Sequence, residues 1–288
     1  MVNRLPLAPP GAGLGRNGKI MEWRVPVLDA AACAELLSAL TEIAVRAARA
    51  IRERIGKDGV QRKADGSPVT AADIAAQAVI CEGLSRVAPT LPVVAEEQAE
   101  RPRPAGGSYF LVDPLDGTRE FIAGRDEYTV NIALVSNGVP MLGVIAAPAL
   151  FLIWRGVVGR GAERMTFAAD GKILPATPIH ARKPPLHRPV VLISRSHLDA
   201  RTQAYLDGLP QPRTIACGSS VKFCRLAEGS ADLYPRLGPT HDWDVAAGHA
   251  IVEAAGGQVR TPDGGPLRYG SEDLLIPGFI ATGEAVRS

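Results

Sequence analysis

Cysteine is scarce in this 288-residue sequence, and no C-x-x-C spacing occurs. The four cysteines are scattered over apolar or helical stretches, at Cys33, Cys81, Cys217 and Cys224. We therefore expect reduced, buried thiols in a cytoplasmic protein rather than a disulfide framework. The sequence also lacks a large excess of basic over acidic residues, or of acidic over basic ones. The net charge of +2 gives no support for a nucleic-acid polymer or an acidic membrane as a partner held by bulk electrostatics.

Long uninterrupted apolar runs are also missing from the sequence. Residues 130–154 are quite apolar, but Asn131, an Asn137-Gly138 pair and two prolines interrupt them. A membrane span of about 20 residues would not carry an Asn-Gly turn at its centre. The sequence therefore predicts no transmembrane segment.

The N-terminal stretch lacks the pattern of a signal peptide. Residues 1–20 are rich in proline and glycine and contain no apolar core segment. We expect residues 1–27 to form a disordered tail. Met21 precedes the first well-patterned sequence and is an alternative start.

The first half of the sequence combines helical patterns with strand patterns. Apolar stripes and capping residues predict helices over residues 29–55 and 70–87. Residues 63–69, between them, are expected to form a loop. A strong hairpin signal covers residues 128–146 and turns at Asn137-Gly138. Two helices against a largely antiparallel sheet are the predicted arrangement.

A proline-rich stretch, residues 176–189, is a candidate domain junction. Strands and helices alternate after it, which indicates a smaller α/β layer. We predict an N-terminal α+β subdomain over residues 28–178 and a C-terminal α/β subdomain over residues 179–288. The predicted fold class is therefore α/β, in the form of an α+β layered sandwich.

The most constrained motif is Asp113-Pro114-Leu115-Asp116-Gly117-Thr118, which follows an apolar run typical of a buried strand. Pro114 has no N–H and a fixed φ, so it cannot continue a ladder or a helix, and Gly117 permits a backbone shape that other residues resist. Clustered acids repel one another unless a cation lies between them. A hard divalent cation takes oxygen ligands from carboxylates, carbonyls and water. The motif therefore favours a cation site over a simple Asx turn.

Three further segments place carboxylates beside a strand end or a helix start, at Asp73, Glu96-Glu97 and Asp244. Taken singly, each has an alternative explanation. Asp73 lies three residues after Thr70, which is the spacing of a capping box. The glutamate pair can be an exposed loop pair, and Asp244 can complement the dipole of the helix that it begins.

Together these segments resemble the lithium-sensitive, magnesium-dependent phosphomonoesterase superfamily that includes the inositol monophosphatases. Its pattern is an Asp, a Glu-Glu pair, Asp-Pro-hydrophobic-Asp-Gly-Thr, and Trp-Asp followed by small residues and Gly. The same elements occur here in the same order, and the last is Trp243-Asp244-Val245-Ala246-Ala247-Gly248. The resemblance spans residues 28–285. It implies the sugar-phosphatase, or inositol-monophosphatase-like, αβαβα fold.

The resemblance implies a metal centre lying mainly in the N-terminal subdomain and completed by the C-terminal one. Its ligands would be Glu96, Asp113, the carbonyl of Leu115, Asp116 and Asp244. Two or three Mg²⁺ ions would bind, with Mn²⁺ as a substitute, and lithium would inhibit by displacing one of them. No His or Cys belongs to this set, which argues against zinc.

The resemblance also implies how the reaction proceeds. Thr118 and Asp73 would position and activate the attacking water, and Glu96 would join them as a catalytic residue. Paired divalent ions can clamp both the nucleophile and the leaving oxygen of an in-line phosphoryl displacement.

Within the superfamily, the sequence most resembles the bacterial 3'(2'),5'-bisphosphate nucleotidases of sulfur assimilation and nucleotide recycling. The segments that carry this likeness are Thr118-Arg119-Glu120-Phe121-Ile122, Ser194-Arg195-Ser196-His197, Gly218-Ser219-Ser220-Val221-Lys222-Phe223-Cys224 and Leu233-Tyr234-Pro235-Arg236. The implied reaction is hydrolysis of adenosine 3',5'-bisphosphate to AMP and phosphate. The sulfated nucleotide PAPS is a second candidate substrate.

A bisphosphate brings a second phosphate, which needs cations and hydrogen-bond donors. The expected substrate-binding residues are Gly117, Thr118, Arg195, His197, Ser219, Ser220, Lys222, Arg236 and Asp244. Arg236 argues against inositol phosphate, because an inositol monophosphatase is expected to place an acid nearby that accepts bonds from ring hydroxyls. Surface or interdomain salt bridges are the alternative role for Lys222 and Arg236.

Two other functions stay open at this point. One keeps the chemistry and changes the substrate to inositol phosphate or another sugar or polyol phosphate. The other is a phosphate-ligand sensor without catalysis, against which the complete set of acids argues. The sequence does not indicate whether the protein is a monomer or a homodimer. Relatives can lie peripherally on the cytoplasmic face of the inner membrane, although no amphipathic anchor is visible here.

Overall fold

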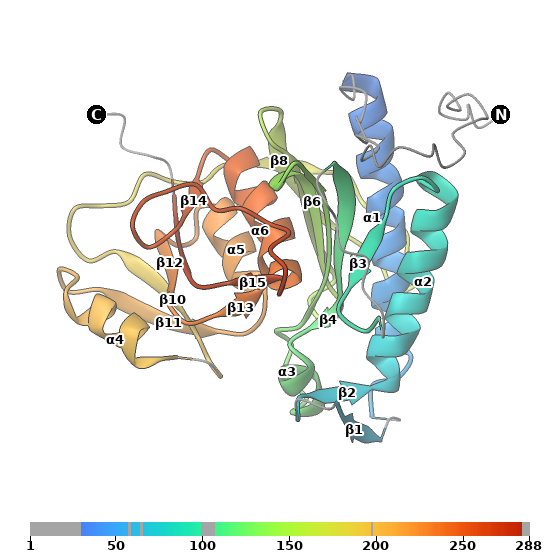
Figure 1. Cartoon of the computed structure of the whole chain (residues 1–288), viewed down its shortest axis with the longest axis horizontal. Coiled ribbons are helices and arrows are strands. Elements are labelled where there is room, and N and C mark those ends of the chain that lie inside the picture. Colours follow the sequence, from blue (N-terminus) through green and yellow to red (C-terminus); the bar gives the residue numbers. More distant parts are fainter. Residues whose placement is uncertain (1–29, 57–58, 64–65, 99–106, 197, 284–288) are drawn as a thin grey trace, which may run out of the picture.

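The protein is built from five stacked layers of helices and sheets (Figure 1). The computed structural model describes residues 30–56, 59–63, 66–98, 107–196 and 198–283. Across the molecule, the layers are a helix pair, a seven-stranded sheet, a second helix pair, a five-stranded sheet and an outer helix. This alternation confirms the predicted αβαβα sandwich.

The seven-stranded sheet is almost entirely antiparallel. Its strands follow one another in sequence order, and within it β3 and β4 form the parallel pair. The predicted hairpin joins β5 to β6, and Asn137 and Gly138 take positive φ values of 50° and 73°, as a tight two-residue turn requires. The strands are β3 (Val93–Ala95), β4 (Ser108–Asp116), β5 (Thr129–Ser136), β6 (Val139–Ala147), β7 (Leu152–Val157), β8 (Gly161–Thr166) and β9 (Thr177–Ile179).

Two helices, α1 (Ala30–Arg52) and α2 (Ala71–Val87), cover one face of this sheet. Side chains alternate along each strand because the period of a strand is two residues. In β4, Phe110 packs in the core beneath α1 and α2, whereas its neighbour Tyr109 packs in the core on the opposite face. The near-continuous apolar run of β4 is therefore explained by a sheet that is covered on both faces.

The second helix pair is α5 (Val221–Ala227) and α6 (Asp242–Ala254). It lies between the two sheets, and small residues allow close packing there (Figure 1). A Cβ added at Gly143 of β6 would lie 2.4 Å from the carbonyl oxygen of Ala247 in α6, and one added at Gly248 would lie 2.3 Å from the ring of Phe223 in α5. The small residues after Trp243-Asp244 therefore let the start of α6 approach the first sheet.

The five-stranded sheet mixes parallel and antiparallel pairs, in the order β11-β10-β12-β16-β14. Strand β10 runs parallel to β11 and β12, and β16 runs antiparallel to β12 and β14. Helix α4 (Ala200–Asp207) lies on its outer side (Figure 1). The strands are β10 (Val190–Ser194), β11 (Arg213–Cys217), β12 (Leu233–Arg236), β14 (Gln258–Arg260) and β16 (Phe279–Thr282), and a separate short pair is β13 (Thr240–His241) with β15 (Leu275–Ile276).

Some segments differ from the sequence prediction. Part of the predicted loop over residues 63–69 is a strand: Pro68 and Val69 belong to β2 (Pro68–Thr70), which pairs antiparallel with β1 (Val60–Arg62). Strands β8 and β9 were not predicted, because both lie at the outer end of the sheet and lack a clear apolar alternation. Strand β9 also falls within the proline-rich stretch of residues 176–189, where Pro178 is tolerated at a sheet edge.

The predicted first helix ends at Arg52 rather than at residue 55. The predicted tail, residues 1–27, and the predicted helix start at Asp29 lie outside the described residues. The division of the chain at residue 178 stays a prediction, and β9 spans it. Among the helices of the described segments, none is both long and apolar enough to cross a bilayer.

Candidate active site

The acidic turn lies where β4 ends and the short helix α3 (Thr118–Ile122) begins. Pairing with β5 skips from Asp113 to Asp116, as expected around a proline that has no N–H. Asp113 is buried, and its Oδ1 accepts a hydrogen bond from the amide of Leu115 at 3.0 Å. Gly117 has φ of 93°, and a Cβ there would lie 3.1 Å from the carbonyl oxygen of Glu127. Glycine is therefore required for this turn.

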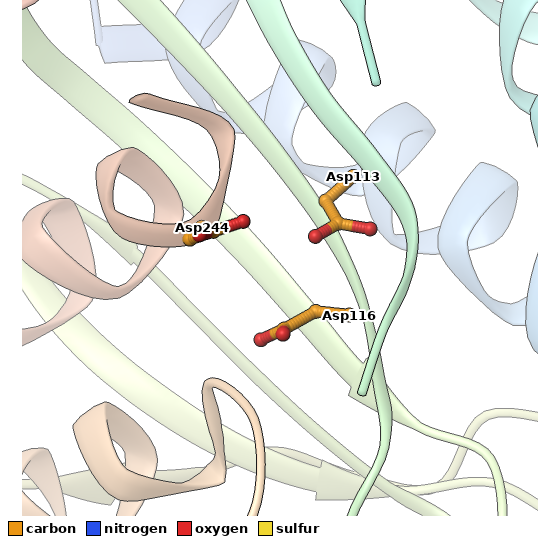
Figure 2. A group of neighbouring side chains, drawn as sticks. All are labelled: Asp113, Asp116 and Asp244. Carbon is orange, nitrogen blue, oxygen red and sulfur yellow. The ribbon is translucent and has the colours of Figure 1, made fainter. Parts of the chain in front are cut away.

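Three carboxylates from two distant parts of the sequence converge beside the turn (Figure 2). Asp113 and Asp116 belong to β4, and Asp244 lies in the first turn of α6. Each of the three residues contributes one carboxylate oxygen to a group in which all three oxygens lie within 4.8 Å of one another. This spacing suits a cation with oxygen ligands shared by the three acids.

The electrostatics of this group also favour a bound cation. Burial, followed by the charges of Glu96 and Asp116, raises the pKa of Asp113 well above its usual range. Burial and the charge of Asp244 raise the pKa of Asp116 to about 6, although the ammonium of Lys222 opposes this shift. A divalent cation between the acids would favour their charged forms and reverse these shifts.

Neighbouring hydroxyl and amide groups orient the carboxylates. Ser220 Oγ lies 2.7 Å from Asp116 Oδ2 and 3.0 Å from the carbonyl oxygen of Asp244, so its single hydrogen serves one acceptor at a time. Asn131 Nδ2 donates to Ser220 Oγ at 2.9 Å. Thr240 donates its hydroxyl hydrogen to Asp244 Oδ2. Such contacts hold potential metal ligands in a fixed orientation.

Glu96 is not one of the three converging acids, but it lines the pocket beside them. Lys63 Nζ is 2.7 Å from Glu96 Oε1 and 2.5 Å from Glu97 Oε1, so one ammonium pairs with both glutamates. Burial nevertheless raises the pKa of Glu96 to about 7, against the opposing charge of Lys63. Because the charge of Glu96 contributes to the raised pKa of Asp113, the two carboxylates interact electrostatically.

Thr118 and Asp73 form a hydrogen-bonded pair next to the acidic turn. Thr118 Oγ1 lies 3.0 Å from Asp73 Oδ1 and 3.2 Å from the carbonyl oxygen of Leu115. The other oxygen of Asp73, Oδ2, accepts bonds from the amide and the hydroxyl of Thr70 at 2.8 and 2.7 Å. The capping box predicted as an alternative role for Asp73 is therefore present. One buried side chain caps α2 and contacts Thr118 at the same time.

A pocket of about 400 Å³ opens beside these residues. Its wall combines the acids Glu96, Asp116 and Asp244 with residues from α3, the turn before α5, the end of β12 and the β13–β15 pair. The predicted substrate-binding residues that line it are Gly117, Thr118, Ser219, Ser220, Lys222, Arg236 and Asp244. His197 lies outside the described residues.

The three predicted substrate-binding cations differ in their contacts. Lys222 Nζ donates to the carbonyl oxygens of Ser219 and Cys217, at 2.6 and 3.1 Å, and so holds the turn before α5. Arg236 lines the pocket and donates from Nη2 to the carbonyl oxygen of Pro239 at 3.2 Å. Arg195 is not among the described residues that line the pocket, and its Nη2 lies 2.7 Å from Glu127 Oε2.

Three residues at the site were not singled out from the sequence. Lys63 pairs with the two glutamates, and it gave no signal because it lies in the predicted loop. Asn131 is buried with its Oδ1 lacking a hydrogen-bond partner within the described residues, and a polar residue inside an apolar strand pattern was a usable signal. Glu120 lines the pocket and belongs to the segment of residues 118–122, for which the resemblance to nucleotidases implied no role of the acid.

A family model described as the inositol monophosphatase family matches residues 33–285. The curated protein named 3'(2'),5'-bisphosphate nucleotidase CysQ of Shigella flexneri is 48% identical over 223 residues, which cover 76% of this chain and 87% of that protein. The protein of the same name from Escherichia coli (strain K12) is 47% identical over 223 residues, with the same coverage.

Solved structures show the same fold. The crystal structure of CysQ from Bacteroides thetaiotaomicron, described as a bacterial member of the inositol monophosphatase family, matches with a TM-score of 0.76 at 35% identity. It covers 87% of this chain and 98% of that one. The structure of inositol monophosphatase from Anabaena (Nostoc) sp. PCC 7120 matches with a TM-score of 0.70 at 27% identity, and the match covers 88% of this chain and 92% of that one.

Proposed function

Because the chain belongs to the inositol monophosphatase family, we propose that it is a metal-dependent 3'(2'),5'-bisphosphate nucleotidase. Its substrate is adenosine 3',5'-bisphosphate, which it hydrolyses to AMP and phosphate, and PAPS is a second candidate substrate. The observation that carries the proposal is the convergence of Asp113, Asp116 and Asp244 beside a pocket, next to the Thr118–Asp73 pair. The name shared by relatives at 47–48% identity supports the choice of substrate.

The donor set fits magnesium. Asp113, Asp116 and Asp244 would hold one ion, and Glu96 with the carbonyl of Leu115 would complete a second site with Asp113. All of these ligands are oxygen atoms, which hard divalent ions prefer, so Mg²⁺ is proposed and Mn²⁺ is a substitute. When bound, the ions neutralise charge on the phosphate and lower the pKa of a bound water.

Thr118 and Asp73 provide the proton acceptor. When Thr118 donates its hydroxyl hydrogen to Asp73 Oδ1, 3.0 Å away, its oxygen is free to accept a hydrogen from the attacking water. As the water oxygen bonds to phosphorus, its proton passes to Thr118 Oγ1, and the hydroxyl proton passes to Asp73. The bond from phosphorus to the ester oxygen of the nucleotide breaks, and that oxygen takes a proton from solvent water to leave as the free hydroxyl of AMP. Because burial raises the pKa of Asp73, this carboxylate holds a proton more readily than an exposed one.

The remaining phosphate needs positive charge. Arg236 lines the pocket and the charge of Asp244 acts on it, so its guanidinium lies near the acids while keeping donors for an anion. Lys222 compensates Asp116 and shapes the turn that carries Ser219 and Ser220. We propose Arg236 as the main cation for the second phosphate. Arg195 and His197 stay predictions as substrate contacts.

Phosphate release tests the proposal. Adenosine 3',5'-bisphosphate and inositol 1-phosphate are offered in parallel, with Mg²⁺ and with a chelator. We expect release from the nucleotide that depends on Mg²⁺ and is much faster than release from inositol phosphate. Equal or faster release from inositol phosphate would move the assignment to the polyol phosphatases, and tight binding without release would favour a sensor. A cytoplasmic location stays a prediction.

A further inference from the structure

Glu120 is a buried acid at the pocket wall that the proposed chemistry does not use. It lies in α3, two residues after Thr118, with 4% of its surface exposed, and it lines the pocket. The other carboxylates of the lining, Glu96, Asp116 and Asp244, are all proposed metal ligands. Glu120 therefore needs a separate explanation, because burying a carboxylate costs free energy unless donors satisfy it.

The known contacts of Glu120 satisfy one of its two oxygens. Ser196 Oγ donates to Oε1 at 2.7 Å. Arg125 Nη1 lies 4.0 Å from the same oxygen, and the Arg125 side chain is 48% exposed, so its charge is largely screened by solvent. Within the described segments, Oε2 accepts no hydrogen bond from protein. As far as the described residues go, one carboxylate oxygen is thus left for a donor that enters the pocket.

The packing around Glu120 keeps the carboxylate at the wall. A Cβ added at Gly218 would lie 2.9 Å from Glu120 Cγ and 2.7 Å from the carbonyl oxygen of Glu127. A side chain at that position would displace the carboxylate or the backbone. Because Gly218 has no side chain, the side chain of Glu120 has room to pack against it.

The negative charge of Glu120 limits which part of the substrate it can contact. A carboxylate repels a phosphate, and the pocket already offers Arg236 for that group. A neutral hydroxyl or amine can instead donate to a carboxylate, and a charge-assisted hydrogen bond of this kind is strong. A nucleoside bisphosphate carries such donors on its ribose and on its base.

We propose that Glu120 Oε2 accepts a hydrogen bond from a neutral donor of the nucleoside part of the substrate and so selects nucleoside bisphosphates. This inference rests on the proposed function and adds a specificity-determining residue to it. The donor is the ribose 2'-hydroxyl or the 6-amino group of the base, and the experiment separates these two sources.

Three substrates and the Glu120→Gln variant test the inference. The substrates are adenosine 3',5'-bisphosphate, its 2'-deoxy analogue and purine riboside 3',5'-bisphosphate, which lacks the 6-amino group. For the wild-type enzyme, removing the contacted donor should lower kcat/KM by about 10- to 100-fold. In Glu120→Gln, kcat/KM for the parent substrate should fall by a similar factor, whereas kcat/KM for the analogue without that donor should be close to its wild-type value. The analogue that wild type and Glu120→Gln hydrolyse with equal kcat/KM therefore identifies the donor.

Two further variants distinguish recognition from a structural role. Ser196→Ala removes the protein donor to Oε1 and leaves the carboxylate, so its ratio of kcat/KM between substrates should stay close to that of the wild type. Glu163→Gln, on β8, is a matched acid-to-amide control whose ratios should not change. Unchanged ratios in Glu120→Gln would overturn the inference, and so would equal changes in Ser196→Ala.

The test also separates this inference from the proposed function. If the wild-type enzyme releases no phosphate from any of the three nucleotides, the nucleotidase assignment is wrong and the inference is wrong with it, before any variant is compared. If the nucleotides are hydrolysed but all three at the same kcat/KM, the function stands and the role of Glu120 is wrong.

Discussion

Ser220 Oγ lies 2.7 Å from Asp116 Oδ2 and joins the turn before α5 to the end of β4. The same hydroxyl accepts a hydrogen bond from Asn131 Nδ2 at 2.9 Å. A chain of contacts therefore runs from β5, through Ser220, to a carboxylate proposed to bind metal. Because both ends lie on packed elements, the orientation of Asp116 is set by the core rather than by solvent.

Replacing Ser220 with alanine should weaken metal binding. The change removes the hydroxyl donor to Asp116 and leaves Asn131 Nδ2 without this acceptor, so the carboxylate is held less firmly, with Asn131 Nδ2 at 3.5 Å as a weaker contact. Loss of such an orienting partner typically costs about 10- to 100-fold in metal affinity. Calorimetric titration with Mg²⁺ measures the effect, and Ser85→Ala, at an exposed position of α2, is the control. Equal affinity in Ser220→Ala and wild type would contradict the prediction.

Asp116→Asn should abolish turnover without unfolding the protein. The amide keeps the shape of the side chain but is a poor metal ligand, so kcat should fall by at least about 100-fold, more than for loss of an orienting partner. The metal-free variant should unfold at the same or a higher temperature than metal-free wild type, because one charge is removed from a repelling group. Phosphate release and thermal unfolding are the measurements. A wild-type rate would refute the metal assignment.

Thr118→Val should separate water activation from metal binding. Valine keeps the size of the side chain and removes the hydroxyl that lies 3.0 Å from Asp73 Oδ1. We expect kcat to fall by about 100-fold or more, the usual contribution of positioned proton transfer, while Mg²⁺ affinity stays close to wild type. Thr118→Ser restores the hydroxyl and should recover most of the rate. A serine variant as slow as the valine variant would count against proton transfer through this hydroxyl.

The stability of the metal-free protein should fall as pH rises. In the folded state the pKa of Asp116 is about 6 and that of Glu96 is about 7, both raised above their usual values mainly by burial. The folded state then binds more protons than the unfolded state between about pH 4 and 7, so this contribution is complete at low pH and is lost as pH rises through the folded pKa values.

Thermal unfolding with a chelator, from pH 5 to pH 8, measures this effect by comparing wild type with Asp116→Asn. The variant should gain stability relative to wild type as pH rises, because its amide does not ionise. Mg²⁺ should raise the melting temperature of wild type more at pH 8 than at pH 5, since protons compete with the metal at the acids. A metal-induced shift that is independent of pH would contradict the prediction.

Local patterns in the sequence predicted the elements that carry the site. The apolar run before Asp113 predicted β4, and the Asn137-Gly138 turn predicted the β5–β6 hairpin, because both depend on residues that are neighbours in the chain. The capping box of Thr70 and Asp73 was recognised for the same reason. Strands β8 and β9 were missed, since they are held by pairing with a neighbouring strand rather than by an apolar pattern of their own.

The sequence by itself determined the chemistry of this protein: which acids occur in which order, that no His or Cys joins them, and that a rigid turn carries two of them. Only the tertiary structure decided which groups meet, including the pairing of Lys63 with the two glutamates and of Arg195 with Glu127. The reason is physical. Turns and caps depend on adjacent residues, whereas ion pairs and pocket walls depend on how helices and sheets pack across long separations in the chain.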